Sequence, residues 1–432
     1  MRIWFSVAAM SVMLTVASAA AAQSLVPSTD YEVPQFYGRG KNTSVLERER
    51  PEYQALGIRT GGFTILPRVE TGLTHTNNVY FSDSPPVTGG LPKVADTYFI
   101  VKPSVVAQSN WGRHALRLEG GLNAKRYFKY DSENTTSWNV RGDAKVDIYG
   151  DSFLNFGGDA QKVFEDRGSV NGSQNNVKPV PVEIQGLYAR GVYGQDRVRG
   201  TFDASYRNFD YKNVTGNVDQ NGRDYDGWQG GARADVALSP DTALFVKGSY
   251  GENAYKHSTT TNPARDNSNT RILGGANFDL TSLARGELGV GYTKRDYDLA
   301  TFTDISGFAL SSKLEYFPTQ LLTITGVAVR QIQDSSFNNS GGYFQNQVSL
   351  GGDYELRRNL IVSVAGGYEY DKYKGIDRKD KVGNLALSGR YFVNNVVGLG
   401  LTLSTAKRTS SGAQFGPEYK ATQIGLSLVF QR

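Results

Sequence analysis

The chain contains no cysteine, and it has only three histidines among its 432 residues. The absence of cysteine excludes structural disulfides and thiolate metal sites. Histidine is the residue that acid and base catalysis uses most, yet His75, His114 and His257 stand far apart, and the one adjacent hydroxyl, on Ser258, makes no catalytic geometry. We therefore expect no enzyme, no catalytic residues, no metal site and no cofactor.

The chain also lacks long apolar runs and a strong charge. After residue 22, no stretch reaches the roughly 18 apolar residues of a transmembrane helix. The net charge of +5 comes without a basic cluster interleaved with aromatic residues, so we expect no nucleic-acid partner. What the chain does have is 49 Gly, 25 Tyr and 21 Phe, mostly in alternating segments. A membrane barrel, with one face of each strand toward lipid and the other toward water, has this composition.

The N-terminus is typical of a secretory signal peptide. Arg2 supplies the positive charge, an apolar stretch runs from Ile3 to Val16, and three alanines precede Gln23 as a cleavage site. We expect residues 1–22 to be removed, residues 23–62 to form a periplasmic extension, and residues 63–432 to form the barrel. The extension, which carries several Pro and Gly residues, is either a disordered tail or a segment that lines the pore mouth or docks a periplasmic partner.

The C-terminal segment ends in an aromatic residue two positions from the chain end. Four large apolar residues alternate there with small or polar ones. The pattern is that of the insertion signal which outer-membrane barrels present to the barrel-assembly machinery, and we expect that machinery as a partner. The key positions of this signal are Gln423, Gly425, Leu428 and Phe430.

Eighteen alternating segments follow one another, from 63–79 to 419–431. An even count is what a single-chain bacterial barrel requires. Tight turns such as Asn110-Trp111-Gly112 alternate with longer polar loops such as Gly168 to Pro179, which assigns the turns to the periplasm and the loops to the cell exterior. We predict an all-β fold, a transmembrane antiparallel up-and-down β-barrel of about 18 strands. A soluble β-sandwich also alternates, but it rarely needs this rhythm of connections.

The polar face of each segment carries charges that we expect to line a wet lumen, because Arg or Lys facing lipid at the midplane costs about 2 to 4 kcal/mol. Acidic and basic residues are nearly balanced on this face. We expect them to pair across strands and stiffen the wall, in preference to forming a transport filter. The candidates are Arg68, Glu70, Lys102, Arg117, Glu119, Lys125, Arg141, Asp143, Lys145, Asp147, Arg199, Asp203, Arg233, Asp235, Lys313, Glu315, Asp353 and Glu355.

Aromatic residues gather near the outer ends of the segments. We expect most of them to form the girdle at the membrane interface, whereas any that turn inward could stack on sugar rings. The residues concerned are Tyr127, Phe128, Tyr130, Phe209, Tyr211, Tyr225, Tyr255, Tyr297, Tyr370 and Tyr373.

The first segments resemble a known family. Gly62-Phe63 through Gly72, followed by Asn77-Asn78-Val79-Tyr80, is similar to the opening strand of the family called putative β-barrel porin 2. Lys102-Pro103-Ser104 and the stretch from Ser109 to Leu116 resemble its next two strands. The resemblance runs from about residue 56 to the end, but only its first seventy residues or so are motif-like, and the later strands resemble the family in rhythm alone. The resemblance implies a role beside exopolysaccharide assembly, and it transfers no functional residues.

The expected protein is an outer-membrane channel of a Gram-negative bacterium, and the leading hypothesis is a conduit for exopolysaccharide secretion. Its partners would be outer-membrane lipid, a glycan and periplasmic polysaccharide-export proteins. A general diffusion porin for small solutes is the first alternative. A structural or adhesive surface barrel is the second, and an outer-membrane lipid hydrolase the third.

Overall fold

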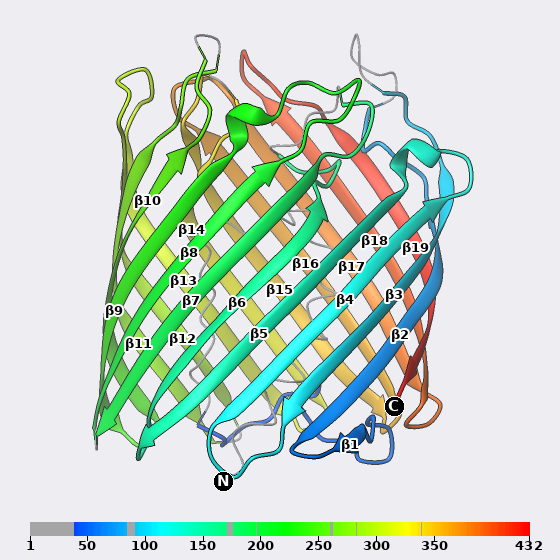
Figure 1. Cartoon of the computed structure of the whole chain (residues 1–432), viewed down its shortest axis with the longest axis vertical. Helices are drawn as coiled ribbons and strands as arrows, with labels where there is room; N and C mark the ends of the chain where they lie inside the picture. Colours follow the sequence, from blue (N-terminus) through cyan, green and yellow to red (C-terminus); the bar gives the residue numbers. More distant parts are fainter. Residues whose placement is uncertain are drawn as a thin grey trace.

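A computed structural model describes residues 39–83, 91–170, 176–195, 197–259, 262–281, 283–337 and 339–432. Within these residues the chain forms one antiparallel sheet that closes into a barrel of tilted strands (Figure 1). Strands β2 to β19 make the wall, and a short strand, β1, pairs beside β2. The predicted all-β barrel of 18 strands is confirmed. The predicted signal peptide lies outside the described residues.

The wall strands are 13 to 16 residues long, which suffices for a tilted strand to cross a membrane. Two short 3-10 turns, η1 (Asp131–Glu133) and η2 (Asn221–Arg223), lie in the loops, and no helix in the described part of the chain is long and apolar enough to cross a bilayer. The strands are β1 (Ile58–Thr60), β2 (Phe63–Thr76), β3 (Asp96–Ser109), β4 (Ala115–Tyr127), β5 (Thr135–Tyr149), β6 (Ser152–Phe164), β7 (Pro181–Gln195), β8 (Val198–Tyr211), β9 (Tyr225–Ser239), β10 (Thr242–Tyr255), β11 (Asn267–Leu280), β12 (Ala284–Tyr297), β13 (Ile305–Thr319), β14 (Leu322–Asp334), β15 (Gly342–Arg357), β16 (Leu360–Tyr373), β17 (Lys379–Phe392), β18 (Val397–Ser411) and β19 (Tyr419–Gln431).

The barrel closes where the last strand meets the first. Residues 423–431 of β19 pair with residues 68–76 of β2, so the beginning of β2 has no wall neighbour on that side. β1 folds back to fill this gap, with Ile58 opposite Ile65 and Thr60 opposite Phe63. An unpaired strand edge is a template for aggregation, and β1 covers it.

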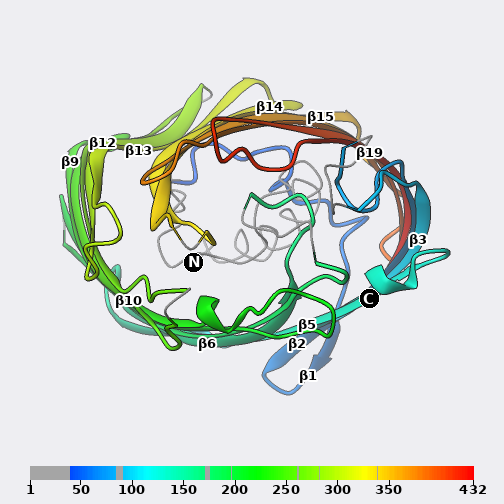
Figure 2. The same ribbon diagram turned by 90° about the horizontal axis from the view of Figure 1, so that it is seen from above.

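The connections differ at the two ends of the barrel. Turns at one end are tight, as at Gly150, whose φ of 58° suits a glycine between β5 and β6. Loops at the other end are longer and bend over the opening (Figure 2). Short turns face the periplasm in such barrels, so we call the two ends the periplasmic end and the outer end. The C-terminus lies at the periplasmic end (Figure 1).

The outer surface of the wall is apolar, with aromatic residues at both ends. On β5, exposed Val140, Val146 and Ile148 share one face, as strand alternation requires. Near the outer end the exposed aromatics include Phe99, Phe128, Trp138, Tyr206, Trp228, Tyr250, Tyr292, Phe308 and Tyr368. Near the periplasmic end they include Tyr149, Tyr193, Tyr316, Tyr354, Tyr391 and Phe430. These two belts mark the interfaces of the membrane.

Candidate functional site

The charged residues predicted for the lumen all occupy the strand positions opposite in parity to the exposed apolar residues. Arg141, for example, alternates with exposed Val140, and Glu315 alternates with exposed Leu314. Side chains on one strand point alternately to the two faces of the sheet, so these charges belong to the inner face.

Twelve of the 18 predicted charges pair along their own strand, two residues apart. The predicted pairing across strands also occurs, since Arg233 of β9 pairs with Glu287 of β12 at 2.8 Å and Glu315 of β13 pairs with Arg285 of β12. Pairing along the strand was not predicted. Residues i and i+2 share a face, and long side chains lean along the strand, so an Arg reaches a carboxylate two positions on. The pairs are Arg68–Glu70 (2.9 Å), Arg117–Glu119 (3.0 Å), Arg141–Asp143 (2.8 Å), Lys145–Asp147 (2.6 Å), Arg233–Asp235 (2.7 Å) and Lys313–Glu315 (3.5 Å).

The other predicted lumen residues make different contacts. Lys102 pairs across to Glu70 at 3.2 Å, and the ammonium of Lys125 lies 5.6 Å from the ring centre of Tyr98. Asp353 accepts a hydrogen bond from Ser363 at 2.5 Å. The register sets Arg199 opposite Asp235, Asp203 opposite Arg190 and Arg233 opposite Lys247.

A cavity on the inner face is lined mainly by neutral polar side chains. Gln229, Ser249, Asn269, Thr293 and Gln331 contribute amides and hydroxyls from five strands. Polar side chains continue this lining onto β15 and β16. The side-chain amide of Gln331 donates to Gln345 (3.0 Å), and the side-chain amide of Gln345 donates to Glu369 (3.0 Å). Arg271 and Arg295 border the same cavity. Amides and hydroxyls thus form a band on this wall, bordered by two arginines and by Glu369.

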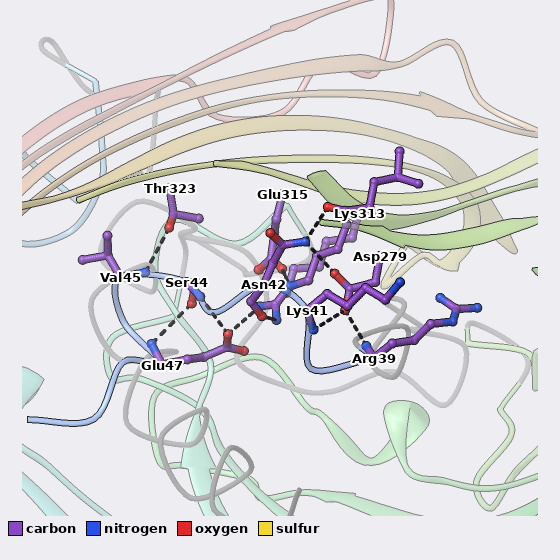
Figure 3. Close-up of polar contacts among 12 residues, drawn as sticks. Arg39, Lys41, Asn42, Ser44, Val45, Glu47, Asp279, Lys313, Glu315 and Thr323 are labelled. Atoms are coloured by element: carbon purple, nitrogen blue, oxygen red, sulfur yellow. Dashed lines mark hydrogen bonds and ion pairs between the residues drawn. The ribbon is translucent and has the colours of Figure 1, made fainter. Parts of the chain in front are cut away.

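Residues Arg39–Gly57, which we call the mouth segment, lie against the inner wall at the periplasmic end. Asp279, at the end of β11, is the first anchor (Figure 3). Its carboxylate accepts from the backbone N–H groups of Arg39 (2.6 Å) and Lys41 (3.2 Å) and from the amide of Asn42 (2.7 Å). Asp279 is fully buried, so these donors replace the water that a carboxylate requires.

Two further ion clusters hold the middle of the segment. Arg285 donates to the carbonyl of Asn42 at 2.9 Å, pairs with Glu47 at 2.5 Å, and pairs with Glu315 of the wall. Val45, fully buried, donates its N–H to the hydroxyl of Thr323 at 2.9 Å.

Glu355, which was predicted as a lumen residue, forms the second of these clusters. Arg50 approaches it at 2.7 Å and Arg48 at 3.1 Å, and only about 4% of the Glu355 side chain is exposed. Burial lowers the pKa of Arg50 below its ordinary value, while Glu355 opposes that shift. A guanidinium stays charged at neutral pH all the same, so this is a buried ion pair.

The segment ends at the seam of the barrel. The ring of Tyr53 stacks on Phe392 of β17 with the ring centres 6.1 Å apart. The carbonyl of Tyr53 accepts from the side chain of Gln431 in β19 at 3.1 Å. The segment therefore passes along the rim from β11 through β12, β14 and β15 to β19, and then enters β1.

Sequence reasoning missed most of this arrangement. The segment was left open between a disordered tail and a lining of the pore mouth, and Arg285, Glu47 and Arg50 were not singled out as site residues. The available signal was charge complementarity. The extension contains Arg39, Arg48 and Arg50, and the inner face places two acidic residues, Asp279 and Glu355, at the periplasmic ends of β11 and β15.

The outer end is narrowed by loops that reach across to other strands. The carbonyl of Gly168, in the loop after β6, accepts from the hydroxyl of Tyr419 at 3.2 Å, and that of Ser169 accepts from Arg408 at 3.1 Å. Arg408 and Asp380 are both buried and form an ion pair at 2.9 Å. Arg265 donates to the carbonyls of Gly222 and Ser335, which belong to two other loops.

Five of the aromatic residues predicted mainly for the interfacial girdle are instead buried at this end. Phe209 stacks on Tyr225 with ring centres 4.5 Å apart, and Tyr225 stacks on Tyr255 at 5.2 Å. The five buried residues are Phe209, Tyr211, Tyr225, Tyr297 and Tyr373, and Tyr255 is partly buried. Their strand parity is that of the inner face, and the loops pack over them, so they form a hydrophobic layer under the loops rather than an open platform for sugar rings. Phe128 is exposed, in agreement with the girdle.

The three histidines do not meet in the structure. His75 contacts Thr97, His114 lies by Asp147, and His257 is 3.7 Å from Asp224. Among the described residues, no three His, Asp or Glu side chains form a group that could hold a metal ion.

The sequence model of one protein family, described as putative beta-barrel porin 2, matches residues 50–432. The chain belongs to this family. The match covers the barrel and the last part of the mouth segment. As a member of the putative beta-barrel porin 2 family, with a closed barrel of 18 strands, the protein is an outer-membrane channel of a bacterium. Porins are in general non-enzymatic.

A comparison of this chain with curated proteins gives no match. Among solved structures, the outer membrane protein OpdK of Pseudomonas aeruginosa is similar, with 12% identity and a TM-score of 0.48 over 85% of this chain and 99% of that one. The siderophore receptor PirA of Acinetobacter baumannii has 8% identity and a TM-score of 0.46 over 84% and 80%. The copper transporter OprC has 11% identity and a TM-score of 0.45 over 89% and 82%.

Proposed function

We propose that this barrel conducts an exopolysaccharide across the outer membrane. The observation that carries the proposal is the chemistry of the inner wall. Most of the charges predicted for it are paired within or between strands, and beside them runs a band of amides and hydroxyls that includes Gln229, Asn269 and Gln331. The family resemblance, which implies a setting of exopolysaccharide assembly, supports the same cargo.

Such a wall suits a long hydrated chain of sugars. Paired charges leave little net field, so they neither repel an uncharged glycan nor trap a charged one. Amides and hydroxyls exchange hydrogen bonds with sugar hydroxyls at nearly equal free energy to water, because each bond formed replaces one lost. A conduit must bind its cargo weakly enough to release it, and this lining meets that condition.

The two narrowed ends give the conduit its control points. The mouth segment stands where a glycan enters from the periplasm, and the outer loops stand where it leaves. Release of the mouth segment from Asp279 and Glu355 would widen the opening through which the glycan enters. A periplasmic polysaccharide-export protein is the partner that this end would meet.

The test compares secretion with uptake in cells that lack the gene. We expect secreted exopolysaccharide to fall sharply, while uptake of small solutes stays as in the parent strain. Normal secretion with slowed uptake would overturn the proposal in favour of a general diffusion porin. Normal values of both would favour a structural or adhesive barrel. Complementation with the wild-type chain controls for effects on neighbouring genes.

A further inference from the structure

Five lysines form a group on the outside of the barrel near its outer end. We call Lys372, Lys379, Lys381, Lys407 and Lys420 the lysine patch. All five are exposed, and they lie on the neighbouring strands β16 to β19. They have the parity of the lipid-facing residues of the same strands, such as Leu385, Leu403 and Ile424. The patch thus stands on the outer face, directly above the apolar band.

The register brings these charges close together. Lys372 is paired directly with Lys379, and Lys407 is paired directly with Lys420. Directly opposed residues in a sheet have Cβ atoms about 5 Å apart, and like charges in such positions repel. Within the described residues, none of the five lysines has a carboxylate at ion-pair distance. The folded chain therefore holds two directly opposed pairs of like charges, and a fifth lysine beside them, without an ion pair to a carboxylate.

Lysines at the same end of the opposite wall are arranged differently. Lys212 pairs with Asp210 at 2.5 Å and with Glu183 at 3.1 Å. Lys294 pairs with Asp296 at 2.6 Å, and Lys256 pairs with Asp226 at 3.3 Å. Outward lysines on that wall are thus neutralised by the protein itself. The direct opposition of unpaired lysines is a feature of β16 to β19 that Lys212, Lys256 and Lys294 do not share.

The surface beside the patch has room for a bulky headgroup. One row of directly opposed residues crosses the four strands and consists of Tyr368, Gly383, Lys407 and Lys420. A Cβ at Gly383 would meet no atom within 4 Å, so the surface is open between the exposed ring of Tyr368 and the stem of Lys407. An aromatic ring at this depth suits the polar part of a lipid, and the leucines below suit its acyl chains.

We propose that the lysine patch binds the phosphate groups of an anionic glycolipid in the outer leaflet. Basic clusters at the edge of a membrane-spanning region bind acidic lipid headgroups because the opposite charges attract in a zone of low dielectric constant. The five lysines lie at the height where headgroup phosphates meet the apolar band. Bound phosphates supply the counter-charge that the protein lacks there. This inference does not depend on the proposed cargo.

The test uses the full-length protein purified in a non-ionic detergent and native mass spectrometry. The probe is diphosphoryl lipid A, and its dephosphorylated form and inorganic phosphate are tested beside it. The triple variant K381Q/K407Q/K420Q removes the centre of the patch. The matched control K212Q/K256Q/K294Q removes three lysines that are paired with carboxylates. Each basic residue near an anionic lipid surface strengthens binding about fivefold, so we expect the patch variant to bind diphosphoryl lipid A about a hundredfold more weakly.

The control variant should bind within about twofold of wild type, and K381R/K407R/K420R should retain binding because the charge is kept. Equal binding by wild type and the glutamine patch variant would overturn the proposal. So would equal binding of the dephosphorylated lipid, or displacement of lipid A by inorganic phosphate at equal concentration, which would indicate a site for free anions. Thermal unfolding without lipid gives a second readout. The glutamine patch variant should unfold at a higher temperature than wild type, because repulsion is relieved, and the control should not.

Discussion

The two ends of the lumen are narrowed in different ways. At the periplasmic end a continuous segment, Arg39–Gly57, lies on the finished wall and contacts it through ion pairs and hydrogen bonds. At the outer end the narrowing comes from loops that join wall strands, and these rest on a layer of aromatic side chains. The mouth segment could leave as a unit without breaking a hydrogen bond between wall strands. The outer loops are continuous with the wall strands.

This difference separates gating from stability. The mouth segment contributes no strand to the barrel before β1, so its release costs only its own contacts. The outer loops are fixed at both ends, and their hydrophobic clusters include wall residues such as Ile184, Phe209 and Tyr373. Disturbing them exposes apolar surface of the barrel itself, at about 25 cal/mol per Å². We therefore expect changes at the periplasmic end to alter conductance and changes at the outer end to alter unfolding.

The largest effect should come from deleting residues 39–50. The deletion removes the anchors at Asp279, Arg285 and Glu355, so single-channel conductance in planar bilayers should rise several-fold, because a narrower path limits current. The substitution D143N, in the exposed pair Arg141–Asp143, serves as a control and should leave conductance near the wild-type value. An unchanged conductance after the deletion would mean that the mouth segment does not limit the path.

The next effect concerns Glu355 alone. The change E355A leaves Arg50 buried without its partner, which costs about 3 to 5 kcal/mol when an ion pair is fully buried. Undocking relieves this cost, so we expect trypsin to cut after Arg48 at least a hundredfold faster, while the midpoint of urea unfolding stays the same. The variant E119Q, at the half-exposed pair Arg117–Glu119, is the control. A shifted unfolding midpoint with unchanged cleavage would reverse our distinction between the two ends.

At the outer end, R408A should lower the free energy of unfolding by about 2 kcal/mol, a typical value for hydrogen bonds to a charged group. Asp380 keeps Arg378 at 2.8 Å and so remains paired, which limits the loss. The measurement is urea unfolding of protein refolded into lipid vesicles. Trypsin cleavage after Arg48 should stay at the wild-type rate, and a faster rate would show that the two ends are coupled.

A smaller loss is expected for Y419F. This change removes one neutral hydrogen bond, from the Tyr419 hydroxyl to the carbonyl of Gly168, and keeps the ring that packs on Phe81. The expected cost is about 1 kcal/mol in the same urea measurement. A loss as large as that of R408A would indicate that the loop after β6 depends on this bond more than on the ion pair.

The smallest effect is that of salt. Lys41 and Asp241 are each about one-third exposed and Arg48 is partly exposed, so raising the salt from about 0.1 to 1 M should weaken these pairs as the screening length falls from about 10 to 3 Å. Cleavage after Arg48 should quicken by a few-fold. Hydrogen exchange in the aromatic layer around Phe209 should not quicken, because apolar contacts are not screened.

Much of the fold follows from local patterns. A strand shows its two faces within a few residues, so Val140 and Arg141 already assign the faces of β5, and the alternation of short and long connections counts the strands. Pairing along the strand, as between Arg68 and Glu70, depends on side-chain rotamers that alternation does not specify.

The docking of the mouth segment could not be predicted in the same way. Arg50 and Glu355 are 305 residues apart, and their contact exists only once the barrel has closed. The inward aromatic residues show a related limit. Phe209 has the inner parity of β8 and Phe202 the outer parity, but alternation does not show that loops from other strands pack over the inward aromatic residues. Sequence therefore predicts the wall well and the contents of the lumen poorly.

The path of the mouth segment has a mechanical consequence. It starts at β11, about halfway round the barrel from β2, and it ends at the seam where β19 meets β2. Along the way it contacts the periplasmic ends of β12, β14, β15 and β17. These contacts link the strands of half of the periplasmic circumference to one another. The arc from β3 to β8 has no such brace among the described contacts. If the rim changes from a round to an oval outline, the wall should therefore bend along the arc from β3 to β8. A cargo wider than the resting opening would be accommodated on that side.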